Sequence, residues 1–263
     1  ASPNAEVVDV ALDRLVAVSA PEATCGGVGD PSSMGLLLNL PERPEGFLQL
    51  TSVDLGVGEI TSISLHPRGL YSLLTQWDAF KPTVNDGSVV AVLGNVVLGS
   101  VTVGPAPDSV DIARNGKLAV VTCEGELPAD CAADWQDELD PDGDGQPNDL
   151  DGDGDVDAND TSLAIARADR PGSIYILDLR RGPGRIRVAA VVTVDAIFNL
   201  FFTGDPSRAS EAKLIEPEYA EISPDSSYAL VSLQEQSAIA VIDLNEVLEL
   251  SGEEDLSPEQ IGA

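Results

Sequence analysis

One short segment of the chain gathers an unusual number of carboxylates. Residues 140–160 read DPDGDGQPNDLDGDGDVDAND, and the wider range 130–160 holds 13 Asp or Glu residues among 31. No Lys or Arg occurs between Lys117 and Arg167, so no base within the segment offsets this charge. At neutral pH such a cluster repels itself. The segment must therefore either stay extended and solvated or bind cations.

The spacing of the carboxylates favours calcium. The frame from Asp149 to Asp160 has Asp at positions 1, 3, 5, 7, 9 and 12 of a twelve-residue loop, with Gly154 at position 6. Ca²⁺ takes about six to eight oxygen ligands, which alternate side chains and one backbone carbonyl, at position 7, can provide around a tight glycine turn. The loop resembles the dockerin type of EF-hand-like loop, and a short helix is expected at 161–168. Its candidate ligands are Asp149, Asp151, Asp153, Asp155, Asp157 and Asp160.

An overlapping frame from Asp140 to Asp151 predicts a second ion. It has Asp at positions 1, 3, 5 and 12 and Gly145 at position 6, and it resembles the thrombospondin type 3 repeat. It adds the candidate ligands Asp140, Asp142, Asp144 and Gln146. The two frames share Asp149 and Asp151, so one carboxylate could bridge neighbouring ions. The alternative is a solvated acidic linker, and Mg²⁺ is less expected because it dehydrates reluctantly.

Outside this segment the chain repeats itself. An alternating apolar run, a polar turn and a second apolar run recur, which is typical of a β-hairpin. The clear copies are 60–76, 109–125 and 219–235, and a weaker copy is 6–20. Third strands are expected at 33–40, 87–93, 172–179 and 237–244, and fourth strands at 47–55, 96–104 and 185–194. A second short helix is expected at 244–250.

Four strands per unit, recurring at about 45 residues, are typical of propeller blades. We therefore predict an all-β fold, a β-propeller with four-stranded blades, four of them visible, within a larger ring or a ring that partner chains complete. A β-sandwich is the alternative, but the recurrence of one four-strand pattern favours the propeller. The predicted blades are approximately 6–55, 59–104, 108–195 and 217–263, with the calcium-loop segment 130–168 inserted in the third.

Composition narrows the function classes. The formal charge of −31 leaves little basic surface to release phosphate counterions, which argues against a nucleic-acid partner. No run of eighteen apolar residues occurs, so no direct membrane insertion is expected. Cys123 and Cys131 flank the turn-rich EGELPAD and are a disulfide candidate in an oxidising compartment, while Cys25 is left over.

Several phrases of the sequence resemble the choice-of-anchor I family. They are Pro107-Asp108, Glu124-Gly125-Glu126, Glu216-Pro217-Glu218-Tyr219 and Leu233-Gln234-Glu235. The resemblance implies a secreted or surface-attached β-propeller, and hence an extracellular location. In this chain Leu127 interrupts the family's EGEP, and the predicted calcium loops replace the short segment that usually follows it. The family's propeller generally has further blades, so a homo-oligomer or further blades of the same protein would complete the ring.

Two functions follow as hypotheses. The first is a structural, adhesive or self-assembling extracellular module that Ca²⁺ stabilises, and the second is a calcium-dependent hydrolase of phosphate esters or similar anions, like phytase-like propellers. The hydrolase would use carboxylates at blade ends around the channel, which could instead hold blades together by accepting backbone N–H bonds. They are Glu124, Glu126, Glu216, Glu218 and Glu235. With His66 as the sole histidine and no nucleophile elbow, the sequence predicts no catalytic residue and favours the non-enzymatic module.

Overall fold

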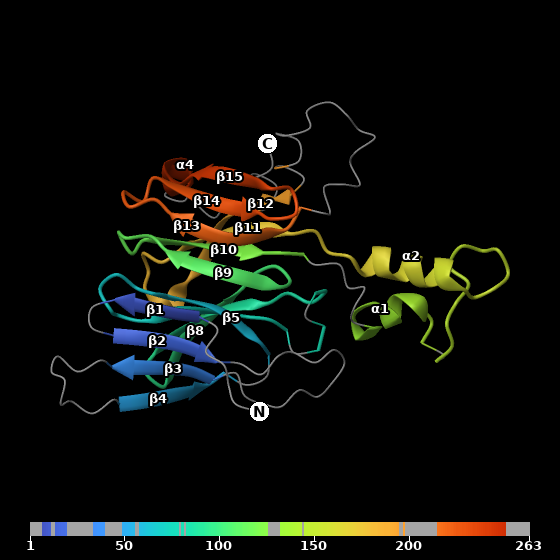
Figure 1. Ribbon diagram of the computed structural model, residues 1–263, viewed down its shortest axis with the longest axis horizontal. Helices are drawn as coiled ribbons and strands as arrows, with labels where there is room; N and C mark the ends of the chain where they lie inside the picture. Colours follow the sequence, from blue (N-terminus) through green and yellow to red (C-terminus); the bar gives the residue numbers. More distant parts are fainter. Residues whose placement is uncertain are drawn as a thin grey trace.

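The computed structural model describes most of the chain from residue 58 to residue 250 and the backbone of several earlier strands. The described residues are 7–11, 14–19, 34–39, 49–55, 58–78, 80–81, 83–125, 132–143, 145–194, 197 and 215–250. They form four antiparallel sheets that follow one another along the chain and lie in a stack (Figure 1).

Each sheet is a meander in which consecutive strands pair. The first comprises β1 (Val7–Ala11), β2 (Arg14–Ser19), β3 (Met34–Asn39) and β4 (Gln49–Asp54). The second comprises β5 (Ile60–Leu65), β6 (Ser72–Gln76), β7 (Ser88–Leu93) and β8 (Val96–Thr102). The third comprises β9 (Pro107–Ile112), β10 (Leu118–Cys123), β11 (Ser173–Asp178) and β12 (Arg187–Thr193). The fourth comprises β13 (Pro217–Ile222), β14 (Tyr228–Leu233) and β15 (Ala238–Asp243).

The first strands of successive sheets are neighbours. β1 contacts β5, β5 contacts β9, and β9 contacts β13, so these strands form the inner side of an arc of blades. This arrangement is that of a β-propeller, and it confirms the predicted all-β fold class. The same hairpin turn joins the first two strands of three blades, with a residue at positive φ that is Gly69, Gly116 or Ser226. Glycine adopts this conformation without steric cost, which explains two of the three polar turns.

The blades pack face to face through apolar layers. Between the second and third sheets lie Tyr71, Leu73, Val89 and Ala91 on one side and Val110, Ile112, Ala119 and Val121 on the other. Between the third and fourth sheets lie Leu118, Val120, Ile174 and Ile176 on one side and Ala220, Ile222, Ala229 and Val231 on the other. Each strand therefore presents alternate residues to two neighbouring blades, because successive side chains of a strand point to opposite faces.

Side chains of the inner strands also bind the backbone of the next blade. The hydroxyls of Ser62 and Ser64 accept hydrogen bonds from the N–H groups of Val110 and Ile112, at 3.2 and 3.1 Å. One blade further on, Ser109 Oγ accepts from Ala220 N–H at 3.0 Å, and Asp111 Oδ2 accepts from Ile222 N–H at 2.8 Å. These contacts repeat at equivalent positions, so they belong to the way the blades dock.

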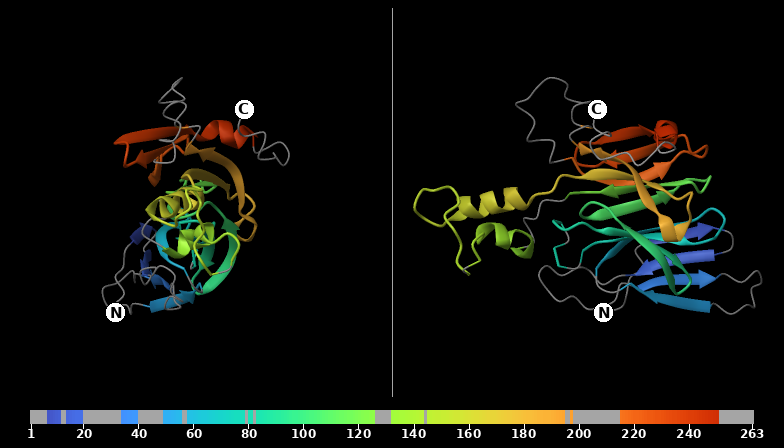
Figure 2. Two further views of the ribbon diagram at one scale, coloured as in Figure 1. Left: turned by 90° about the vertical axis from the view of Figure 1, so that its right-hand side faces the viewer. Right: turned by 180° about the vertical axis from the view of Figure 1, so that it is seen from behind.

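Two helices leave the stack between β10 and β11. α1 (Ala132–Leu139) and α2 (Ala158–Ala168) contact each other and lie to one side of the sheets (Figures 1 and 2). α2 confirms the helix predicted at 161–168, and α4 (Leu244–Leu250) confirms the helix predicted at 244–250. α1 was not predicted from the sequence. None of the described helices is long and apolar enough to cross a membrane.

Candidate functional site

The insertion leaves and re-enters the third blade through a close contact between two glycines. Gly125 follows β10 and has a positive φ, and Gly172 precedes β11. A Cβ at Gly125 would collide with the backbone of Gly172 and Arg170, and a Cβ at Gly172 would collide with the carbonyl of Glu124. The two chain segments at the base of the insertion can approach this closely only because both residues lack a side chain.

Three of the predicted calcium ligands converge within the insertion. Carboxylate oxygens of Asp149, Asp151 and Asp153, at positions 1, 3 and 5 of the second frame, all lie within 4.8 Å of one another. Oxygens bound to one Ca²⁺ at about 2.3–2.6 Å can be at most about 5 Å apart, so this spacing fits a shared ion. The side chains are exposed, which leaves room for further oxygen ligands including water.

Backbone N–H groups hold this loop in its curled form. Asp149 accepts from Gly152 N–H at 2.6 Å and from Gly154 N–H at 2.8 Å. In the first frame, Asp140 accepts from Gly145 N–H at 2.9 Å. The aspartate at position 1 therefore receives the N–H of the glycine at position 6 in both frames. The sequence periodicity that suggested two overlapping loops thus corresponds to a repeated local geometry.

Asp160, at position 12 of the second frame, closes the loop from its other end. Its buried carboxylate accepts hydrogen bonds from Asp157 N–H at 2.7 Å, from Leu150 N–H at 2.6 Å and from Asp151 N–H at 3.2 Å. These donors, that of Asp157 first, hold the pKa of Asp160 below its ordinary value. Asp157 is the N-cap of α2 and forms a capping box with Asp160, so the loop and the helix share one hydrogen-bond network.

Asp151 lies close to three other carboxylates of the loop, and its pKa is raised. A hydrogen bond from Asp153 N–H favours its ionised form, but desolvation and the neighbouring charges of Asp153, Asp160 and Asp149 outweigh that bond and raise the pKa of Asp151. A cation at this position would offset the repulsion that raises this pKa.

Of the remaining predicted ligands, those that the structure describes do not join the cluster of three carboxylates. Asp142 and Asp155 are exposed, and the Gln146 side chain donates to the carbonyl of Gly145 at 2.9 Å. Asp144 lies outside the described residues. The described part of the chain therefore assembles positions 1, 3 and 5 of the second frame, while the first frame shows the matching turn at Asp140.

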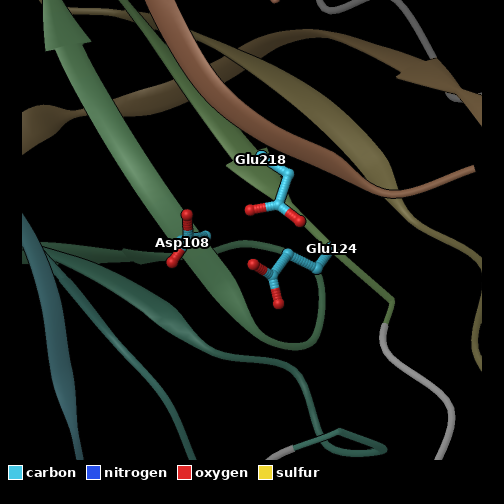
Figure 3. Close-up of side chains that lie close together, drawn as sticks. All are labelled: Asp108, Glu124 and Glu218. Atoms are coloured by element: carbon cyan, nitrogen blue, oxygen red, sulfur yellow. The ribbon is translucent and has the colours of Figure 1, made fainter. Parts of the chain in front are cut away.

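A second group of carboxylates lies on the blades themselves. Asp108 of β9, Glu124 just after β10 and Glu218 of β13 point toward one another, and their oxygens lie within 4.8 Å (Figure 3). We call these three residues the inter-blade triad, because Asp108 and Glu124 belong to the third blade and Glu218 belongs to the fourth. Partial burial, then the charges of Glu218 and Glu59, raise the pKa of Asp108 to about 6.

The triad contains two of the five predicted blade-end carboxylates. Glu124 and Glu218 belong to it, whereas Glu216 is outside it, Glu235 is exposed in the turn after β14, and Glu126 lies outside the described residues. The sequence analysis missed Asp108 as a site residue, although the phrase Pro107-Asp108 was among those that carried the family resemblance. The predicted role of accepting backbone N–H bonds between blades is performed by Asp111, which was not a candidate.

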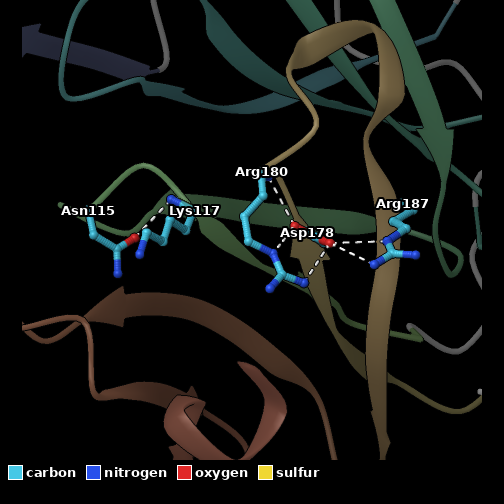
Figure 4. Close-up of polar contacts among 5 residues, drawn as sticks. All are labelled: Asn115, Lys117, Asp178, Arg180 and Arg187. Atoms are coloured by element: carbon cyan, nitrogen blue, oxygen red, sulfur yellow. Dashed lines mark hydrogen bonds and ion pairs between the residues drawn. The ribbon is translucent and has the colours of Figure 1, made fainter. Parts of the chain in front are cut away.

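Another carboxylate of the third blade is neutralised by arginine. Asp178 is buried and accepts from Arg180 Nε at 2.9 Å and from Arg187 Nη2 at 3.0 Å, as Figure 4 shows. Burial alone would raise its pKa, but the hydrogen bonds from Arg180 and Arg187 prevail and hold the pKa at about 2. Arg180 also lines an open pocket of about 570 Å³ with Arg68 and Lys117.

Of the two cysteines in the predicted disulfide, the structure describes Cys123. Cys123 is buried in β10, and burial raises the pKa of its thiol. Cys131 and Cys25 lie outside the described residues, so the Cys123–Cys131 disulfide stays a prediction.

The four meanders around a common inner side define the class of protein as a β-propeller. Residues 42–248 match the choice-of-anchor I domain, and the chain belongs to that family. Membership of the family indicates a surface-associated or secreted propeller module. No curated protein matches the chain.

Similar solved structures are propellers of low sequence identity. Hydrazine synthase of Kuenenia stuttgartiensis is 12% identical with a TM-score of 0.52, and the match covers 94% of this chain and 54% of that one. The β-propeller domain of Cps50 (Swd1) from Myceliophteria thermophila is 10% identical with a TM-score of 0.48, covering 92% and 53%. The chain therefore spans about half the length of the structures it matches, and the likeness concerns the fold alone.

Proposed function

We propose that this protein is a calcium-stabilised, surface-associated propeller module with a structural or self-assembling role outside the cell. The observation that supports calcium most directly is the convergence of Asp149, Asp151 and Asp153 within 4.8 Å, at positions 1, 3 and 5 of a loop that ends in a capped helix. Asp155 would contribute its backbone carbonyl, as position 7 does in loops of this type.

A bound divalent ion would have a structural role because it would offset the repulsion between the carboxylates of the insertion. The insertion carries its excess of Asp and Glu to one side of the packed sheets (Figure 1). Lys81 pairs with Asp137 of α1, whereas Asp149, Asp151 and Asp153 lie in an exposed loop, where solvent and ions offset the repulsion. A divalent ion at the second loop would fix the loop beside α2, and through the shared residues it would also order the first loop beside α1. Extracellular modules of this class bind Ca²⁺ at about 10⁻⁴–10⁻³ M, a range that suits a resident ion outside the cell.

Isothermal titration with CaCl₂ tests the proposal. Wild-type chain should release or absorb heat with a dissociation constant of about 10⁻⁴–10⁻³ M. Asp153→Ala removes a converging carboxylate and should weaken binding by about tenfold or more. Asp155→Ala is the matched control, because it removes the same charge from the same loop but leaves the backbone carbonyl. Absence of saturable binding to the wild-type chain, or equal loss in both variants, would refute the proposal.

The inter-blade triad favours a second function, a metal-dependent hydrolase of phosphate esters or similar anions. Three half-buried carboxylates from two blades could hold a divalent ion that binds an anionic substrate. Turnover of a phosphate monoester should then depend on Ca²⁺ and fall at least about a hundredfold in Glu218→Gln, with Glu235→Gln as the control on an exposed carboxylate. Turnover that is absent from wild type, or equal in both variants, removes this candidate.

A further inference from the structure

The turns at one end of the second and third blades carry positive charge in a strongly acidic protein. The connections that follow β5, β7, β9 and β11 span residues 66–71, 94–95, 113–117 and 179–186. They contain one, none, two and three Lys or Arg residues, six in all, and no Asp or Glu. The whole chain has 14 basic residues against 45 acidic ones. Nearly half of its positive charge therefore lies in these four short connections.

One open pocket lies where these connections meet. It has a volume of about 570 Å³, and residues from both blades line it. Arg68 lies in the turn after β5, Leu93 at the end of β7, Lys117 in the turn after β9 and Arg180 in the turn after β11. Among the described residues that line the pocket, none is Asp or Glu. An anion that enters the pocket therefore meets three cationic side chains and no carboxylate of the lining.

The positive charge of the pocket is not neutralised within the protein. Among the residues that the structure describes, no carboxylate forms an ion pair with Arg68 or Lys117, and both side chains are exposed. Arg180 pairs with Asp178, but that single carboxylate also pairs with Arg187, so the group of three keeps a net positive charge. The pocket thus retains more than one positive charge that a ligand can offset.

His66 holds two of the cationic turns side by side. It is buried, its ring centre lies 4.8 Å from that of Tyr71, and its Nδ1 accepts the N–H of Arg68 at 3.1 Å. A Cβ at Gly116 would lie 2.5 Å from His66 Nε2, so the turn after β9 can pack against the ring only because this residue is glycine. The side chain of the sole histidine therefore fixes the turn that carries Arg68 against the turn that carries Lys117.

Backbone hydrogen bonds hold the two cations of the third blade next to each other. The Lys117 carbonyl accepts the N–H of Leu179 at 2.8 Å, and the Lys117 N–H donates to Asn115 Oδ1 at 2.8 Å. Arg180 follows Leu179, and its N–H donates to Asp178 Oδ1 at 3.0 Å. Figure 4 shows Lys117 and Arg180 on neighbouring connections of this blade. The backbone of the pocket is therefore in place before any ligand binds, which lowers the entropic cost of binding.

The rest of the pocket is largely apolar. Leu70 and Leu93 are 53% and 45% exposed, and Leu98 and Pro183 also line the pocket. A ligand that covers these side chains removes apolar surface from water, which favours binding in proportion to the area covered. An inorganic anion would gain only the electrostatic part of this interaction, whereas an anion with an apolar group would gain both parts.

We propose that this pocket binds a small organic anion, a doubly charged oxyanion such as a phosphate monoester that carries an apolar group. Arg68, Lys117 and Arg180 would bind the oxyanion, because guanidinium and ammonium groups form strong, charge-assisted hydrogen bonds with its oxygens. Leu70 and Leu93 would contact the apolar group. A doubly charged ligand fits best, because the pocket retains more than one positive charge.

The pocket is separate from the two acidic clusters. The inter-blade triad lies where β9 begins and where β10 ends, and the insertion also leaves from the end of β10. The pocket lies where β9 ends and where β10 begins. The cationic pocket and the acidic clusters are thus at opposite ends of the same strands. Binding at the pocket therefore depends neither on calcium nor on assembly.

Isothermal titration with phenylphosphonate, above its second pKa and in buffer freed of divalent ions, tests the proposal. This probe is a doubly charged oxyanion on an apolar ring, and its carbon–phosphorus bond is not a phosphate ester that a hydrolase would cleave. At about 150 mM salt, which screens the overall charge of the protein, the wild-type chain should bind it with a dissociation constant of about 1 mM or tighter. Arg68→Ala and Lys117→Ala should each weaken binding by about tenfold. Arg114→Ala is the matched control, because Arg114 is exposed in the same turn as Lys117 but does not line the pocket.

The apolar part of the pocket is tested with a second pair of variants. Leu93→Asn should weaken the binding of phenylphosphonate by about fivefold and leave that of inorganic phosphate unchanged. Val96→Asn is the control, because Val96 is exposed on β8 but does not line the pocket. Inorganic phosphate that binds the wild-type chain as tightly as phenylphosphonate does would overturn the role of the apolar lining.

Three further results would overturn the proposal. The first is the absence of saturable binding by the wild-type chain, and the second is an equal loss of binding in Arg114→Ala and Lys117→Ala. The third is binding of phenyl sulfate, which has one charge fewer, as tightly as phenylphosphonate. Urea unfolding of Arg68→Ala and Lys117→Ala should match the wild type, which shows that lost binding is not lost folding. Since no divalent ion is present in these titrations, their outcome is separable from that of the calcium and hydrolase proposals.

Discussion

The blades and the insertion both crowd carboxylates together, but they relieve the repulsion in different ways. In the third blade, Asp178 is buried between two arginines, and Asp108 keeps a raised pKa beside Glu218. In the insertion, Asp149, Asp151 and Asp153 are exposed and lie in a stretch of chain that contains no base. Backbone N–H groups hold their positions but do not cancel their charge.

The comparison shows that the same residue type serves different purposes according to its surroundings. Within packed sheets an unpaired charge is costly, so a carboxylate there is paired with a cationic side chain or shifted toward protonation. In a solvated loop the charge persists and attracts ions. A carboxylate of this protein is therefore stabilised by arginine, by a proton or by a divalent ion. Each of the three can be tested by removing it.

The largest effect on the free energy of unfolding is expected for Asp178, which is paired with two arginines. Asp178→Ala leaves two guanidinium groups without their buried acceptor and should lower the free energy of unfolding by about 3 kcal/mol. Asp243→Ala is the control, because Asp243 occupies the equivalent place at the end of β15 but is exposed and accepts only a local N–H, that of Asn245. Urea unfolding should give less than about 1 kcal/mol for the control. Equal losses would contradict the distinction between a buried ion pair and a local turn.

Calcium should act on the insertion rather than on the blades. At an ion concentration about one hundred times the dissociation constant, binding contributes about 2.7 kcal/mol, equivalent to about a hundredfold slower amide exchange in α2. Amides of β10 and β11 should be unaffected, since their protection depends on the sheet core. Hydrogen exchange with Ca²⁺ and with EGTA measures both regions in one experiment. Protection that rises equally in the blades would show that the insertion and the propeller unfold together.

The features that the sequence predicts correctly are those that depend on residues close together in the chain. Hairpins at 60–76 and 109–125 and the helix at 161–168 were predicted because strand alternation and helical spacing are local patterns. The carboxylates of the second loop were predicted for the same reason, since twelve consecutive residues determine their spacing. Helix α1 was missed because its sequence, AADWQDEL, covers only eight residues and has no basic residue in its last turn, where α2 has Arg167.

Contacts between blades were predicted only in part, because they depend on which strands become neighbours. Glu124 and Glu218 were candidates from the family phrases, but Asp108 joins them only once β9 and β13 lie side by side. The exposure of Leu230 and Val241 was also beyond local patterns, since equivalent residues in the third blade are buried. The alternation of a strand shows which residues share a face, and only the arrangement of the blades shows whether that face is covered.

The smallest of the three effects on stability is expected from the protonation of Asp108. Because the pKa of Asp108 rises from 3.8 to about 6 on folding, the folded state binds its proton more tightly than the unfolded state does. The stability from this group is therefore complete below about pH 4 and is lost as pH rises to about 6, by on the order of 2 kcal/mol after allowance for partial solvent screening. Asp108→Asn should remove this dependence and stabilise the protein at pH 7 by a similar amount.

Urea unfolding at pH 4.5 and pH 7 measures that difference. Asp178 does not interfere, because its lowered pKa of about 2 makes its contribution decline only below about pH 4. Asp142→Asn, in the exposed part of the insertion, is the control and should keep the wild-type dependence on pH. An unchanged pH dependence in Asp108→Asn would mean that the triad remains ionised and solvated like the loop. The contrast between blade and insertion would then rest on Asp178 alone.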